Sequence, residues 1–233
     1  MTVDVPVFGN RERDRRNRLT IPVRFTAGTA LRCATRPRWA LEALRGNLPQ
    51  AAPADGRVSP FATQRRILSS LYPVTRDDLD HLRREWPGPL VVKGIIHPDD
   101  AVIAVDHGAD GIVVSNHGGR QLDRTPATID ALPAVVDAVA GRAEVLVDGG
   151  IRRGTDVLTA LALGARAVLV GRPGLHGLAA GGQAGVERVA EILCAEFDRA
   201  LALTGFASPA QVDRSCLACA PSPSVPTEGQ HPW

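Results

Sequence analysis

Four short apolar runs in the second half of the chain each end in glycine or polar residues, and stretches with helical spacing separate them. Strands that alternate with helices of about ten or more residues predict right-handed βαβ units and a parallel sheet. Runs rich in β-branched residues are typical of parallel strands buried on both faces. The predicted strands are PLVVKGI at 89–95, GIVVSN at 111–116, AEVLVDGG at 143–150 and AVLVGR at 167–172, after a short extended piece at 2–6.

The intervening segments predict helices that cover this sheet. Thr75 is a typical N-cap, and Leu79 and Leu82 fall on one face of the helix that follows it. The predicted helices are 36–44, 75–86, 98–109, 128–141, 154–165 and 184–205.

Polar residues directly follow the apolar run GIVV, in the segment SNHGGRQLD at 115–123. In a (β/α)8 barrel the carboxyl ends of the strands converge on one face, and the active site lies there. The sequence therefore predicts a parallel α/β barrel in which His117 and Arg120 form one wall of an active site. A structural role for His117 is the alternative.

Lys93, in LVVKGI, is the only lysine among the 27 basic residues; all the others are arginines. Arginine does not simply replace lysine where a compact point charge must fit a tight place. We therefore favour a functional role for Lys93 over its chance survival at a strand end.

Glycine and arginine residues recur after the last two predicted strands, in DGGIRRGTD and GRPG. Gly149 and Gly150 allow close backbone approach, and Arg172 follows Gly171. Phosphate sites in such barrels are commonly built from the loops after the last two strands and a helix N-terminus. These loops indicate phosphate binding, with plain tight turns as the alternative.

Composition excludes several other classes of function. A formal net charge of +2 gives no argument for a nucleic-acid partner, and RERDRRN at 11–17 is typical of a solvated loop because it has no aromatic platform. No apolar run reaches the roughly 18 residues of a spanning helix, and the first residues lack the apolar core of a signal peptide. We expect a cytoplasmic chain without a membrane span.

Four cysteines are too scattered for a disulfide framework in a chain of 233 residues. Cys216 and Cys219 form a CxxC, but no second pair follows at zinc spacing. We expect no metal site there.

Four ordered motifs, VVKGI, SNHGGRQLD, DGGIRRGTDV and GRP, together resemble the FMN-dependent α-hydroxy acid oxidase and dehydrogenase family. This family includes glycolate and lactate oxidases, lactate and mandelate dehydrogenases and hydroxymandelate oxidase. The opening TVDVPVFGNRERDRRN also matches, so the resemblance runs from Thr2 to about Ser215. It implies oxidation of an (S)-2-hydroxy acid to the 2-oxo acid, with FMN as cofactor and oxygen or another acceptor receiving the electrons.

The resemblance also implies roles for individual residues in catalysis. His117 would be the general base, and Asp4 would pair with it and favour its cationic form. Arg120 would hold the substrate carboxylate through a bidentate contact, with help from Arg11.

Further residues would hold the cofactor. Lys93 would lie near N1 and O2 of the flavin, and Thr2 and Ser115 would hydrogen-bond to it. The ribityl and phosphate groups would contact Asp148, Gly149, Gly150, Ile151, Arg152, Gly171 and Arg172.

The chain also departs from the family, since only about strands four to eight of the (β/α)8 barrel are expected in it. We expect a domain at 1–215 with a lid-like insertion at about 20–74, and a flexible tail at 216–233. Tyr72, the only tyrosine, falls in the lid-like region. A non-catalytic truncated remnant or an interaction subunit is the alternative function, and a homo-oligomer is left open.

Overall fold

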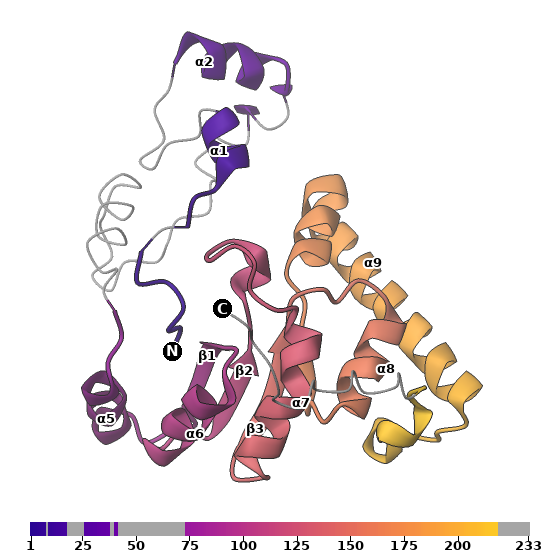
Figure 1. Ribbon diagram of the computed structural model, residues 1–233. Helices are drawn as coiled ribbons and strands as arrows, with labels where there is room; N and C mark the ends of the chain where they lie inside the picture. Colours follow the sequence, from indigo (N-terminus) through magenta and orange to yellow (C-terminus); the bar gives the residue numbers. More distant parts are fainter. Residues whose placement is uncertain (8, 18–25, 38–39, 42–72, 219–233) are drawn as a thin grey trace, which may run out of the picture. The chain divides into compact units, whose positions relative to one another are not determined.

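A computed structural model describes residues 1–7, 9–17, 26–37, 40–41 and 73–218 (Figure 1). The chain divides into two compact units. The first unit comprises Met1–Asp4, Thr75–Gly119 and Asp123–Trp233, and the second comprises Val5–Val74 and Arg120–Leu122.

The first unit is built on a parallel sheet of four strands in the order β1-β2-β3-β4. Its strands are β1 (Val91–Ile95), β2 (Gly111–Val114), β3 (Glu144–Asp148) and β4 (Ala167–Leu169). All four predicted strands are thus confirmed. The predicted extended piece at the start of the chain contributes a parallel bridge from Thr2 to Lys93.

The register of β1 changes at Gly94. Lys93 lies opposite Val113 and Ile95 lies opposite Val114, so Gly94 is an extra residue that forms a bulge. Its φ of +107° is open mainly to glycine. Bulges of this kind redirect side chains, and they are frequent beside active sites.

Helices α5 (Arg76–Glu85), α6 (Pro98–Asp106), α7 (Thr128–Val139) and α8 (Gly154–Ala162) confirm the predictions for their segments. Thr75 is the N-cap of α5, as predicted, and exchanges capping hydrogen bonds with Asp78. Helices α6, α7 and α8 pack along the sheet (Figure 1).

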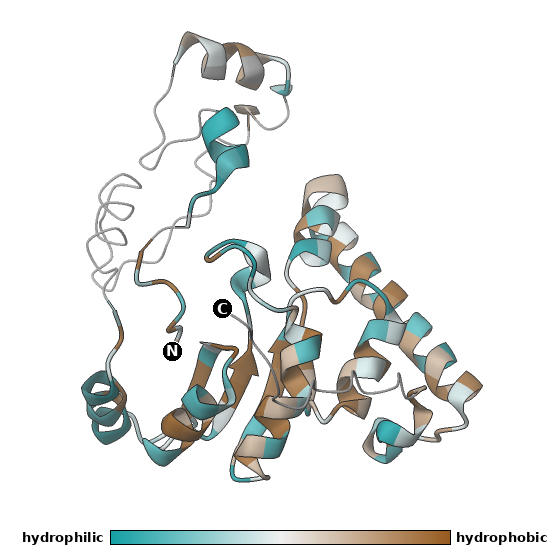
Figure 2. Cartoon of the chain, viewed as in Figure 1, coloured by the Kyte–Doolittle hydropathy of each residue, from teal (hydrophilic) through white to brown (hydrophobic). Residues whose placement is uncertain are grey.

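The core lies between the sheet and these helices, where apolar residues gather (Figure 2). Every residue of β2 is buried, as expected for a central parallel strand. Each fully buried valine, leucine or isoleucine contributes about 1.5 to 3 kcal/mol to stability. The most deeply buried large side chains are Val92, Ile112, Val114, Leu132, Val135, Val139 and Val147.

The last helix, α9 (Arg172–Thr204), starts earlier than the predicted 184–205. Its first turn contains Pro173, which is tolerated there because the first helical N–H groups have no partner inside the helix. The helix is interrupted at Gly181 and Gly182, whose backbone angles are not helical. Sequence patterning therefore identified only the part after this interruption. The 3-10 turns Pro209–Gln211 (η2) and Arg214–Cys216 (η3) follow.

The second unit contains α1 (Glu12–Arg16) and α2 (Ala27–Ala34). The prediction of a loop at 11–17 was wrong, because Glu12 and Arg16 are one helical turn apart and form an ion pair. Much of the expected helix at 36–44, most of the lid-like insertion and Tyr72 lie outside the described residues, as do Cys219 and nearly all of the tail.

Within the described part of the chain, no helix has the length and apolar character needed to cross a bilayer. The same residues contain no group of three or more potential metal ligands, and Cys216 has a free thiol.

Candidate active site

The predicted histidine segment follows β2 as a tight turn, η1 (His117–Gly119). His117, Gly118 and Gly119 all have positive φ, and His117 has a φ of +56° although it has a side chain. Ser115 is fully buried, and its Oγ accepts a hydrogen bond of 3.1 Å from the backbone N–H of His117. This contact helps to hold the unusual turn that presents the imidazole.

His117 and Asp4 meet although 113 positions separate them, with Nδ1 lying 3.1 Å from Oδ1 of the carboxylate. Backbone hydrogen bonds bring Asp4 there: Lys93 N–H donates to the carbonyl of Met1, and Val3 N–H donates to the carbonyl of Lys93. A carboxylate only accepts, so the contact favours the proton on Nδ1 and leaves Nε2 able to act as a base.

Lys93 lies at the same end of the sheet as this pair. Its Nζ is 2.5 Å from Oγ of Ser115 and 2.5 Å from Oδ2 of Asp148. Oγ of Ser115 therefore links the ammonium group to the backbone of the histidine turn. The carboxyl ends of β1, β2 and β3 contribute one side chain each to this cluster.

The loop after β3 lines a cavity of about 420 Å³ within the first unit. Gly149 and Gly150 have positive φ, and Ile151 is buried. Arg172, the first residue of α9, also lines this cavity. Its guanidinium group lies close to the histidine turn, since a Cβ atom added to Gly118 would be 3.5 Å from Nη2. Four of the residues predicted to contact the cofactor therefore line one cavity.

The other predicted phosphate contacts lie outside that lining. The side chain of Arg152 is exposed, while its backbone N–H donates to Asp156. Gly171 is the N-cap residue of α9 and has no side chain to cap it. Oδ1 of Asp148 is buried and has no hydrogen-bond partner within the described residues.

The remaining predicted site residues are distributed between the two units. Thr2 bridges to Lys93 through its backbone, and its side chain is exposed. Arg11 precedes α1 and Arg120 follows η1, and both belong to the second unit. Their roles remain predictions.

Two residues of this region were not singled out from the sequence. Thr128 is buried, and its hydroxyl donates to the carbonyl oxygen of Asp148 at 2.5 Å. Oδ1 of Asn116 accepts from the N–H of Gly119 at 3.2 Å. Both line the cavity. No clear signal in the sequence indicated this role of Thr128. It lies at the predicted start of a helix, where a threonine usually indicates a helix cap and not a contact with a neighbouring strand.

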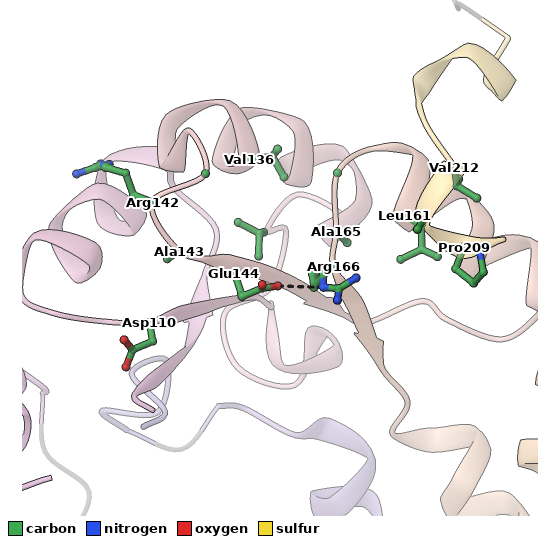
Figure 3. A pocket seen from close by; sticks show the side chains of 14 residues that line it. Asp110, Val136, Arg142, Ala143, Glu144, Leu161, Ala165, Arg166, Pro209 and Val212 are labelled. Atoms are coloured by element: carbon green, nitrogen blue, oxygen red, sulfur yellow. Dashed lines mark ion pairs between the residues drawn. The ribbon is translucent and has the colours of Figure 1, made fainter. Parts of the chain in front are cut away.

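A larger cavity, of about 590 Å³, opens at the amino ends of the strands (Figure 3). The charged residues around it are paired: Glu144 with Arg166 at 3.5 Å, and Asp110 with Arg83 at 3.0 Å. The Leu90 N–H, with Arg83, lowers the pKa of Asp110. These contacts stabilise the fold, and barrel enzymes act at the opposite face.

Comparison with known proteins gives consistent matches along nearly the whole chain. A family model described as FMN-dependent dehydrogenase matches residues 1–219. L-lactate oxidase of Nostoc sp. is 51% identical over 219 residues, which are 93% of this chain and 55% of that protein. Mouse 2-hydroxyacid oxidase 1 is 44% identical over 218 residues, again 93% and 55% of the two chains. The chain thus spans about half the length of these curated relatives.

Solved structures agree with these matches. The crystal structure of monotopic membrane protein (S)-mandelate dehydrogenase has a TM-score of 0.83 and 40% identity, covering 91% of this chain and 57% of its own. A mandelate oxidase has a TM-score of 0.69 and 42% identity, covering 91% and 52%. The predicted fold class is thereby confirmed, since the parallel strands are part of a (β/α)8 barrel fold. The chain belongs to the FMN-dependent dehydrogenase family of oxidoreductases.

Proposed function

We propose that this chain takes part in the FMN-dependent oxidation of an (S)-2-hydroxy acid to the 2-oxo acid. The pair of Asp4 and His117, joined through Ser115 to the ammonium of Lys93, is the observation that supports it best. The relatives named lactate oxidase and 2-hydroxyacid oxidase agree with this substrate class.

FMN is the cofactor of the family, and the residues present suit it. The buried Oδ1 of Asp148 accepts no hydrogen bond from the residues that the structure describes, so it suits the hydroxyl of a ligand. Gly149 and Gly150 line the cavity without side chains of their own, and Arg172 supplies a cation for a phosphate. We assign Asp148, Gly149, Gly150, Ile151, Arg152, Gly171 and Arg172 to the ribityl and phosphate groups, and Thr2, Lys93 and Ser115 to the ring.

FMN, when bound, supplies the acceptor for the two electrons that leave the substrate. Lys93 provides a positive charge that favours the reduced, anionic cofactor. The buried hydroxyl of Ser115 holds the ammonium in place.

His117 acts as the general base: its Nε2 accepts a proton from the 2-hydroxy acid. Asp4 keeps the other ring proton on Nδ1 and stabilises the imidazolium that forms. One of the two protons lost by the substrate goes to Nε2 of His117, the other passes with the two electrons to the acceptor that FMN supplies, and the substrate leaves as the 2-oxo acid.

Arg120 and Arg11 hold the carboxylate of the substrate in this proposal. A guanidinium group matches a carboxylate through two parallel hydrogen bonds, which fixes the orientation of the acid. The electrons pass on to oxygen or to another acceptor, since the relatives include both oxidases and dehydrogenases.

We place this activity in the cytoplasm. One solved relative is a monotopic membrane protein, so fractionation tests this point: recovery of the chain in washed membranes would contradict it. We also propose that 1–215 forms one family domain.

A chimaera tests the function directly. The part of the Nostoc L-lactate oxidase that this chain does not match is fused in front of Met1, to supply the strands of the barrel that we expect to precede this chain. The chimaera should bind FMN in a 1:1 ratio, and L-lactate should bleach its flavin absorbance without oxygen. Residues 1–233 alone should bind FMN much more weakly. A chimaera that binds FMN but is reduced by no 2-hydroxy acid would favour the alternative of a non-catalytic chain.

A further inference from the structure

Gly94 lies directly against the carboxylate that faces His117. A Cβ atom added to Gly94 would lie 2.7 Å from both Cβ and Cγ of Asp4 and 3.0 Å from its backbone nitrogen. These distances are far shorter than van der Waals contact, so Asp4 would have to move.

The bulge in β1 creates this arrangement. The extra residue at position 94 has a φ of +107°, and pairing with β2 resumes at once through Ile95. On the other side of β1, hydrogen bonds hold Met1 and Val3 to the backbone of Lys93. Asp4, the residue after Val3, therefore lies against Gly94. The absence of a side chain at Gly94 leaves the room that Asp4 occupies.

Asp4 has little freedom to retreat. Its side chain is only 14% exposed, and Oδ1 already lies 3.1 Å from Nδ1 of His117. A shift of the carboxylate by the amount that a methyl group needs would break that hydrogen bond. His117 would then lose the contact that keeps its proton on Nδ1.

We infer that Gly94 is a positioning residue, which fixes Asp4 and through it the tautomer of His117. This inference rests on the proposed function only for its effect on catalysis. The bulge thus leaves the position after Lys93 without a side chain, and this gives Asp4 the room that it occupies.

The test compares Gly94→Ala with Gly164→Ala, in the 233-residue chain labelled with ¹⁵N at histidine. Gly164 is a matched control, since its φ is +104° and an added Cβ would lie 2.7 Å from Cγ1 of Val136, away from the site. The shifts of the two ring nitrogens report the tautomer, and His117→Gln identifies the signals of His117.

We expect Gly94→Ala to lower the ratio of the Nδ1–H to the Nε2–H tautomer of His117 by about tenfold, the equivalent of one hydrogen bond to a charged group. Gly164→Ala should leave the ratio unchanged although its backbone strain is similar. In the chimaera, Gly94→Ala should lower kcat and leave KM nearly unchanged. An unchanged tautomer ratio in folded Gly94→Ala would overturn the inference.

A second variant covers the case in which Gly94→Ala does not fold. Adding Asp4→Gly removes the clashing side chain, so the double variant should fold and match Asp4→Gly alone in the signals of His117. Gly164→Ala carries a similar strain in φ and controls for it. Failure of the double variant to fold while Gly164→Ala folds would show that Gly94 acts through contacts other than the Asp4 side chain and would overturn the inference. A changed tautomer with an unchanged rate of flavin reduction would instead refute the proposed role of His117 as base.

Discussion

The ammonium group of Lys93 lies 2.5 Å from the carboxylate of Asp148, and the two side chains come from strands on either side of β2. In the proposed site, this carboxylate would partly cancel the positive charge that Lys93 would offer to a reduced flavin. The ion pair of Lys93 and Asp148 thereby carries a smaller net positive charge than Lys93 alone.

Replacing this carboxylate should therefore change the redox behaviour of bound FMN. In the chimaera, Asp148→Asn should raise the midpoint potential of bound FMN, making its reduction more favourable by about 1 kcal/mol. The reason is that the neutral amide leaves more of the Lys93 charge uncompensated. Spectroelectrochemical titration measures this potential. Lys93→Met should lower it, and a shift of Asp148→Asn in the same direction as Lys93→Met would contradict the interpretation.

The phosphate assignment predicts a difference between two ligands. Arg152→Ala combined with Arg172→Ala should weaken FMN binding to the chimaera much more than riboflavin binding, because only FMN carries the phosphate. Arg166→Ala is the matched control, since this exposed arginine lies at the opposite ends of the strands. Equal weakening of both ligands, measured by fluorescence titration, would remove the phosphate assignment.

The general-base proposal predicts a loss of rate without a loss of cofactor. His117→Ala should slow flavin reduction in the chimaera by about 10² to 10⁴ while FMN stays bound. His107→Ala removes another histidine that pairs with an aspartate, at 2.6 Å from Asp80, and should leave the rate unchanged. Stopped-flow absorbance measures both rates, and a normal rate in His117→Ala would exclude the mechanism.

Binding of the substrate carboxylate should depend on the planar shape of the Arg120 guanidinium group. Arg120→Lys in the chimaera should mainly raise KM for L-lactate, because a point charge replaces a planar fork. Steady-state kinetics measure KM and kcat separately. A fall in kcat with unchanged KM would place Arg120 in another role.

Packing between α8 and α9 predicts a change in stability. A Cβ on Gly154 would collide with the backbone of Glu196 and Phe197, so Gly154→Ala should lower the free energy of unfolding by about 3 kcal/mol. Gly174→Ala, within α9, meets no neighbour and should instead add about 0.5 to 1 kcal/mol. Urea denaturation of the chain compares the two, and similar values would contradict the contact described.

Some of this architecture could be predicted from local sequence. The strands were predictable because runs such as GIVV contain only apolar residues and glycine, as expected for a strand buried on both faces. Helix α5 was predictable because Thr75, a typical N-cap, precedes an amphipathic stretch. The start of α9 was missed, since glycine and proline in GRPG indicate a turn unless the proline falls in the first helical turn.

The site was predictable only in part, since its contacts join distant positions. His117 had a structural alternative, and its partnership with Asp4 followed from the family resemblance alone. A glycine inside a strand indicates a bulge, but no local pattern shows that Gly94 faces Asp4. The separation of 113 residues between His117 and Asp4 leaves no periodic signal in the sequence.

Ser115 has a consequence for how this site can change over time. Its one buried oxygen is bound both by the ammonium of Lys93 and by the backbone of the histidine turn. A substitution there therefore disturbs the contacts of both Lys93 and His117 in a single step. Under the roles proposed for these two residues, proton removal and electron acceptance would be coupled at this position, so adaptation to a new hydroxy acid would have to begin at other residues.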